Sequence, residues 1–216
     1  TAELYRLSSR PIVNTAPELI NVFKEFLLKP FHAVLLLIPD FFGHPTTRNF
    51  FANPAANYYE VSLFIGTIPI VFVLTSLLGK FHSKALIWFF ALLGIISASF
   101  AFDLPHSRFI YEIKLPVLST GIAHRILFLE AFSFTVLAAF GLEHWLKSKK
   151  PISTWFSAVL ITLTFIGIWG FFYRVSQTPH KYLWPFDPKL IWWPVSIRNS
   201  VIPTAVWLIG LGLFIA

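Results

Sequence analysis

The sequence contains no cysteine and no methionine, and only 12% of its 216 residues are charged. Without cysteine, the chain has no disulfide framework, no thiolate metal site and no cysteine nucleophile. So few charged side chains cannot cover a water-soluble domain, in which about a quarter of the residues are charged. A soluble enzyme, a disordered chain and a nucleic-acid-binding domain are therefore excluded.

The residues that dominate instead are apolar: 56% of the chain is hydrophobic and 18% is aromatic. Low charge together with abundant Phe, Leu and Ile is also not the signature of an outer-membrane barrel, whose strands alternate apolar and polar residues. A membrane helix needs about 20 mostly apolar residues. We therefore predict an all-α, polytopic transmembrane helical bundle with four complete spans and a fifth, truncated span, at about residues 57–79, 85–102, 126–145, 154–173 and 200–216.

The chain is expected to have two parts, an interfacial segment at residues 1–56 and a transmembrane bundle at residues 57–216. In the first part, Glu18–Lys29 has apolar residues on one face and acidic ones on the other, which predicts an amphipathic helix. Residues 31–38 are apolar but too short to span, so they favour an interfacial or re-entrant segment. We expect further interfacial helices in the long loops between the spans.

The connections between the predicted spans indicate an orientation. Lys80–Lys84 and His144–Lys150 are short and basic, whereas Asp103–Arg125 and Arg174–Asn199 are long and mixed in charge. The two short loops share one face, and the long loops share the other face with residues 1–56. The long-loop face carries more basic residues in total, but the short loops carry theirs at higher density near span ends. We therefore expect the short loops in the cytoplasm and the other face to be extracytoplasmic.

The first candidate site lies in PDFFGHPTTRN, which places Asp40, His44 and Arg48 within nine residues. A carboxylate there could act as a base, and an arginine could bind a phosphate with its planar fork. The alternative interpretation is a capped turn, in which Asp40 satisfies backbone donors and Gly43 supplies a positive φ.

A second candidate set lies at the predicted span ends. Glu60 follows two tyrosines, and His124 and Arg125 precede Glu130, which falls inside a predicted span. An ionisable residue within the membrane favours a function and needs a partner. An ion pair between Glu130 and Arg125 is possible, but their spacing of about a turn and a half is not ideal. The alternative interpretations are structural. The two tyrosines before Glu60 are interfacial anchors, and Glu60 complements a helix dipole. Arg125 extends to the interface, and Glu130 is a buried carboxyl with its hydrogen bonds satisfied. The histidines show no HxxxH or HExxH spacing, so we predict no histidine metal site.

Three stretches in order, PDFFGHPTTRNFF, NYYEVSLFIGTIPIVFVLTSLL and HRILFLEAFSFTVLAAFGLEHW, resemble the bacterial YfhO-type membrane proteins over about residues 2–146. The resemblance implies a fold related to the GT-C glycosyltransferases. It also implies a multi-pass protein of the bacterial cytoplasmic (inner) membrane that moves a sugar from a polyprenyl-phosphate carrier to a cell-envelope polymer or lipid.

GT-C enzymes usually hold their catalytic acid in the first extracytoplasmic loop, and no such loop precedes the first predicted span. We therefore expect a fragment that is inactive alone, with the main acid upstream of Thr1 and Asp40 as a weaker candidate base. A divalent metal could assist. The expected ligands are membrane lipid and the lipid-linked sugar, and the candidate substrate-binding residues are His44, Arg48, Glu60, Arg108, His124 and Arg125. The alternative function is non-enzymatic, as a flippase, a transporter-like protein or a structural assembly partner.

Overall fold

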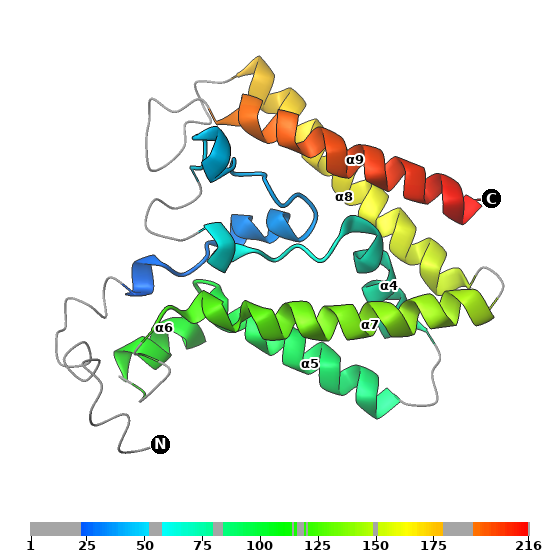
Figure 1. Ribbon diagram of the computed structural model, residues 1–216, viewed down its shortest axis with the longest axis horizontal. Helices are drawn as coiled ribbons and strands as arrows, with labels where there is room; N and C mark the ends of the chain where they lie inside the picture. The colour runs from blue at the N-terminus through cyan, green and yellow to red at the C-terminus, as the bar shows by residue number, and fades with distance from the viewer. Residues whose placement is uncertain are drawn as a thin grey trace.

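The structure is a computed structural model that describes residues 23–51, 58–79, 84–113, 115, 119, 121–148, 151–178 and 192–215. In this part of the chain every named element is a helix (Figure 1), and the β contact is an isolated parallel bridge between Leu28 and Phe102. Four described helices are long and apolar enough to cross a membrane. They are α5 (Lys84–Ala101), α7 (Leu127–Lys147), α8 (Ile152–Gln177) and α9 (Trp193–Ile215). The predicted all-α helical bundle is confirmed.

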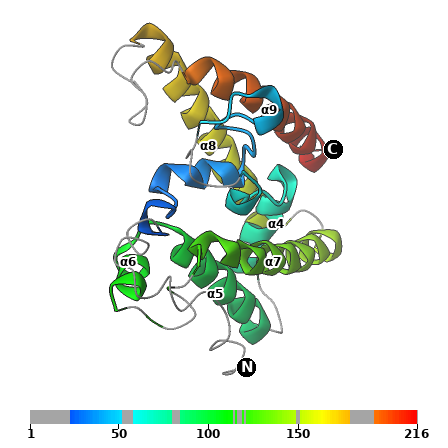
Figure 2. The same ribbon diagram turned by 60° about the vertical axis from the view of Figure 1, so that its left-hand side comes forward.

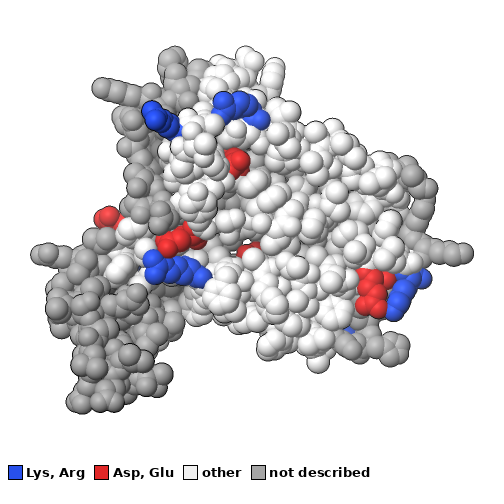
Figure 3. Space-filling model, in the orientation of Figure 1, with Lys and Arg blue, Asp and Glu red and all other residues white. Residues whose placement is uncertain are grey.

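The outer surfaces of the long helices are apolar. Large exposed side chains such as Trp88 on α5, Phe128 on α7, Ile166 on α8 and Ile209 on α9 lie on these surfaces. Figure 3 shows a wide band almost free of charge, with charged side chains mainly toward the two ends of the molecule. Exposed apolar area of this extent is unfavourable in water and suits a bilayer. The protein is therefore a multi-pass membrane protein.

The prediction of a single membrane-spanning helix at residues 57–79 is wrong. This segment consists of a short 3₁₀ helix, η3 (Tyr58–Val61), an irregular stretch at residues 62–66 with a bend at residue 65, and α4 (Thr67–Leu78). Gly66 has a φ of 110°, which interrupts the helical path, and Pro69 fits in the first turn of α4 because its missing N–H is not needed there. Twelve residues reach only about 18 Å along a helix, less than the thickness of the hydrocarbon core.

The later spans are longer than predicted. α8 continues to Gln177, and α9 begins at Trp193 instead of residue 200, so the predicted loop 174–199 is shorter than expected. The length of the apolar run underestimates the length of these helices, because a helix can continue into the interfacial region, where polar side chains are tolerated. α9 therefore carries Arg198 and Asn199 in its first two turns.

The helices form two pairs around α4. α5 packs beside α7, α8 packs beside α9, and α4 contacts α7, α8 and α9 (Figures 1 and 2). α4 and α7 approach closely at Gly141, where an added Cβ would lie 1.9 Å from the carbonyl oxygen of Phe72. Only glycine permits this approach of the two backbones.

The N-terminal described segment lies between the two helix pairs, at the end of the bundle opposite the C-terminus (Figures 1 and 2). It contains the 3₁₀ helices η1 (Pro30–Leu36) and η2 (Pro45–Thr47), and Leu35 and Ile38 are buried in the bundle core. The predicted interfacial or re-entrant segment is thus a short helix packed inside the protein.

Two further predictions concern short helices near the membrane surface. The amphipathic helix predicted at Glu18–Lys29 lies largely outside the described residues, and its described part leaves the helical conformation before Leu28. The long loop after α5 does contain a short helix, α6 (Pro105–Glu112), as expected for that loop. A 3₁₀ helix, η4 (Ala123–Ile126), then leads directly into α7.

Candidate functional site

Asp40 lies in a tight turn after η1. The N–H of Gly43 donates to the Asp40 carbonyl at 2.9 Å, and Gly43 has a φ of 85°. A side chain at Gly43 would collide with the carbonyl of Asn49, so the turn requires glycine. The positive φ predicted for Gly43 is confirmed, but the Asp40 carboxylate does not cap this turn and is available for other contacts.

The Asp40 carboxylate accepts a hydrogen bond from the hydroxyl of Tyr58 on η3. Burial, together with the bond to Asp40 and the charge of that carboxylate, raises the pKa of Tyr58 above its ordinary value of 10.0. The phenol therefore stays protonated and keeps donating at neutral pH. The edge of the His44 ring also contacts the Tyr58 ring, with centroids 4.6 Å apart.

α9 holds the backbone of this turn from the other side. The Asn199 side-chain amide donates to the Asp40 carbonyl at 2.6 Å, and the Ser196 hydroxyl donates to the Phe41 carbonyl at 2.7 Å. These contacts join segments about 155 residues apart. They fix Asp40 against the first turns of α9, which the sequence-based prediction had placed in a loop.

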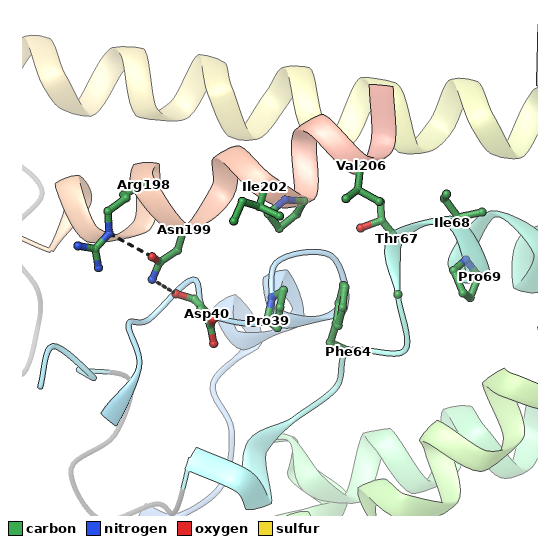
Figure 4. A pocket seen from close by; sticks show the side chains of 12 residues that line it. Pro39, Asp40, Phe64, Thr67, Ile68, Pro69, Arg198, Asn199, Ile202 and Val206 are labelled. Atoms are coloured by element: carbon green, nitrogen blue, oxygen red, sulfur yellow. Dashed lines mark hydrogen bonds between the residues drawn. The ribbon is translucent and has the colours of Figure 1, made fainter. Parts of the chain in front are cut away.

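Asp40 lines a cavity of about 640 Å³ between the turn, the start of α4 and α9 (Figure 4). In Figure 4, Asp40, Arg198 and Asn199 lie toward one end, and Ile68 and Val206 lie toward the other. The cavity therefore has a polar end with a carboxylate and a guanidinium, and an apolar end between α4 and the membrane-spanning helix α9. Its lining is completed by Pro39, Phe64, Gly66, Thr67, Pro69, Ile202 and Pro203.

A second cluster joins η3 to η4. The Nε of Arg125 donates to Glu60 Oε1 at 3.0 Å, and the Nε2 of His124 lies 3.5 Å from Glu60 Oε2. His124 is buried, and its Nδ1 lies 3.2 Å from the Phe26 carbonyl. The structure thus brings together Glu60, His124 and Arg125, which were predicted as candidate site residues from separate parts of the sequence.

The two clusters share η3. Tyr58 and Glu60 belong to the same four-residue helix, one bonded to Asp40 and the other to Arg125. The predicted residues Asp40, Glu60, His124 and Arg125, together with His44, therefore form one continuous region at the long-loop face.

Two other predicted site residues are not part of this region. Arg108 on α6 binds Asp103 through two guanidinium nitrogens, and Lys29 binds the same carboxylate at 2.5 Å. These bonds outweigh the effect of partial burial and lower the pKa of Asp103 from 3.8 to about 2. The cluster ties the N-terminal segment to the end of α5. Arg48 is exposed at the end of η2, where it has a left-handed backbone with φ 53°.

The side chain of His44 also has a structural role, since its Nδ1 accepts a hydrogen bond from the N–H of Thr46 at the start of η2. Glu130 does not pair with Arg125, and its fully buried oxygens have no hydrogen-bond partner among the described residues. In the described part of the chain, no group of three or more His, Asp or Glu side chains is arranged to hold a metal ion. A role for a divalent metal therefore stays a prediction.

Arg198 and Asn199 are the residues of this site that the sequence analysis missed. The signal available for Asn199 was spacing: Ser196, Asn199 and Ser200 recur at helical intervals just before the apolar run of α9. Such spacing places polar side chains on one helix face and predicts contact with a polar partner.

Comparison of the chain with protein-family models, with curated proteins and with solved structures gave no match. The resemblance to YfhO-type proteins and the relation to the GT-C fold therefore stay predictions.

Proposed function

We propose that this chain belongs to a membrane glycosyltransferase that moves a sugar from a polyprenyl-phosphate carrier to a cell-envelope polymer or lipid. The proposal includes a location in the bacterial cytoplasmic membrane, with the Asp40 face extracytoplasmic. The resemblance of three stretches of the sequence to YfhO-type proteins supports it, as does the dense basic charge of the short loops.

The observation that carries the proposal is the cavity shared by Asp40 and Arg198. A lipid-linked sugar has a polar head with a phosphate and a long apolar tail. The cavity offers a carboxylate and a guanidinium at one end and apolar side chains between α4 and α9 at the other. This order of polar and apolar groups matches the order of groups along such a donor.

The reaction requires a base and stabilisation of the leaving phosphate. The acceptor hydroxyl oxygen forms a bond to the anomeric carbon of the sugar, and the bond from that carbon to the phosphate oxygen breaks. Asp40 takes the hydroxyl proton, and the bonding electrons leave with the polyprenyl phosphate. Arg198 is placed to stabilise the negative charge of that phosphate.

Tyr58 and Asn199 position the base in this scheme. Tyr58 occupies one carboxylate oxygen of Asp40, and Asn199 holds the Asp40 backbone. The second carboxylate oxygen is then the one that accepts the proton. Fixing the carboxylate in advance lowers the cost of reaching the reactive geometry.

A second candidate function is transport of the lipid-linked sugar across the membrane without chemistry. The observation that favours it is the interrupted first span, in which a non-helical stretch precedes the 12-residue helix α4 inside the bundle. Discontinuous helices of this kind form substrate sites in many transporters.

One experiment separates the two functions. The full-length protein is reconstituted in lipid vesicles with a radiolabelled polyprenyl-phosphate sugar and a mixture of envelope acceptors. Transfer of label to an acceptor supports the glycosyltransferase. Movement of labelled donor between leaflets with no transfer supports the transporter and contradicts the enzyme.

A further inference from the structure

A second cavity, of about 310 Å³, lies on another side of the molecule from the Asp40 cavity. It is formed by the end of α5, by α6, by η4 and by the first turn of α7. We call it the α6 groove. Its lining residues are Phe100, Ser107, Ile110, Tyr111, Gly121, Ile122, Ala123, Arg125, Ile126 and Phe128, and none of them lines the Asp40 cavity.

The walls of the α6 groove are mostly apolar, and polar groups in them are already bonded. The Tyr111 hydroxyl donates to the Gly121 carbonyl at 3.0 Å, and the Ser107 hydroxyl donates to the Ser99 carbonyl at 2.9 Å. At the rim, Phe128 is 68% exposed on the first turn of a membrane-spanning helix. The groove is therefore suited to an apolar chain supplied from the bilayer.

The polar group at the rim is Arg125, whose side chain is 59% exposed. Its Nε donates to Glu60, and its two terminal amino groups have no hydrogen-bond partner among the described residues. Those amino groups form the edge of a planar fork that fits two oxygens of a phosphate. Arg125 immediately precedes the apolar run of α7, which places it at the depth of the lipid headgroups.

We propose that the α6 groove binds a phospholipid of the bilayer, with an acyl chain among the apolar side chains and the phosphate on Arg125. This site is separate from the proposed sugar-transfer cavity and does not depend on it. The assignment also gives Arg125 a ligand other than the sugar donor. We favour a lipid phosphate over free phosphate because the ligand has to fill the apolar groove as well as bind the unused donors of Arg125.

Two substitutions test the two halves of the site. Arg125→Gln removes the guanidinium fork and leaves the groove. Gly121→Leu adds a bulky apolar side chain to the lining of the groove and leaves Arg125, and a Cβ at Gly121 meets no non-neighbouring atom within 4 Å in the described part of the chain. Arg174→Gln is the matched control, since Arg174 is an exposed arginine in the last turn of α8 and does not line the groove.

The measurement is native mass spectrometry of the full-length protein titrated with phosphatidylglycerol, with diacylglycerol of the same chains, and with inorganic phosphate. We expect Arg125→Gln and Gly121→Leu each to weaken retention of phosphatidylglycerol about tenfold or more, with Arg174→Gln unchanged. Diacylglycerol should bind weakly, and inorganic phosphate should not displace the lipid. Circular dichroism establishes that each variant keeps its helices.

Three results would overturn the proposal. Equal retention of diacylglycerol and phosphatidylglycerol would remove the role of the phosphate. Normal lipid binding by Gly121→Leu would show that the α6 groove has no part in binding and that only the charge of Arg125 attracts the lipid. Displacement of the lipid by inorganic phosphate would make Arg125 a site for soluble anions.

Discussion

The Tyr58 hydroxyl donates a hydrogen bond to the Asp40 carboxylate and joins two segments that are 18 residues apart in the sequence. The position of Tyr58 at the start of a predicted span is typical of an anchor at the membrane surface. In the structure its hydroxyl is bonded to the carboxylate that we propose as the base. Glu60, two residues further along η3, binds Arg125, so this four-residue helix connects both clusters of the site.

Removal of this hydroxyl should slow sugar transfer without abolishing it. Tyr58→Phe keeps the ring against His44 but frees both carboxylate oxygens of Asp40. We expect a loss of about tenfold in the rate, or roughly 1.4 kcal/mol, because an orienting contact is lost and the base remains. Initial rates with a labelled donor measure it. Tyr59→Phe is the control, since Tyr59 is 81% exposed. A full rate in Tyr58→Phe would show that the bond has no part in catalysis.

The fold was predictable where the hydrophobic signal is long. α5, α7, α8 and α9 each contain an apolar, weakly charged run near the length of the membrane, so their existence followed from composition. The segment at residues 57–79 has the same composition but folds differently. In this segment Gly66 has a positive φ, and α4 begins just before Pro69. Neither feature can be predicted from the hydropathy of the segment. Local backbone geometry decided the outcome there.

The orientation of the bundle can be tested with single cysteines, because the chain has none of its own. Thr47 lies near Asp40, and Ser148 follows α7 at the basic short-loop face. In intact cells we expect Thr47→Cys to react with an impermeant thiol reagent and Ser148→Cys to react only after the membrane is opened. The reverse pattern would place Asp40 in the cytoplasm and contradict the proposed donor side.

Acidification should weaken the link between the N-terminal segment and α5. The pKa of Asp103 is lowered to about 2 by Arg108 and Lys29, from an ordinary value of 3.8. The folded state thus favours the ionised carboxylate. Its stabilisation is complete above about pH 4 and is lost as the pH falls toward 2. Thermal unfolding in detergent should show this loss in the wild type. Asp103→Asn should be less stable at neutral pH and should approach the wild type at the acidic end; a constant difference across this range would contradict the assignment.

The close approach of α4 and α7 makes Gly141 a sensitive position. Gly141→Ala places a methyl group against the Phe72 carbonyl and should lower the free energy of unfolding by about 1–3 kcal/mol. Gly167→Ala on α8 is the control, because among the described residues no atom outside its own stretch of helix lies within 4 Å of its added Cβ. That change should be neutral or stabilising by up to about 1 kcal/mol. Denaturant titration of both variants measures the difference, and equal stability would mean that the two backbones are further apart.

The candidate site was predictable in part. Asp40, Glu60, His124 and Arg125 were identifiable as charged or titratable groups next to apolar runs. Their pairing was not, because Glu60 and Arg125 meet through the packing of η3 on η4. The sequence left an ion pair between Arg125 and Glu130 open at a spacing that is not ideal, whereas the structure pairs Arg125 with a residue 65 positions away.

Arg198 and Asn199 were missed for a different reason. They lie in the part of α9 that precedes its apolar run, and the predicted helix began after them. The contact between Asn199 and the Asp40 carbonyl spans 159 positions, and no local pattern reports it. Long-range packing of α9 on the Asp40 turn therefore completed a site whose carboxylate alone was visible in the sequence.

The most direct test of the proposed function is the rate of sugar transfer by Asp40→Asn. This variant keeps the size of the side chain but cannot accept the acceptor's proton. Glu143→Gln, an exposed carboxylate paired with Lys147 near the end of α7, is the control. With a labelled polyprenyl-phosphate sugar and the full-length protein, we expect Asp40→Asn to lose about a hundredfold or more in rate and Glu143→Gln to keep it. Transfer by Asp40→Asn at the wild-type rate would contradict Asp40 as the base.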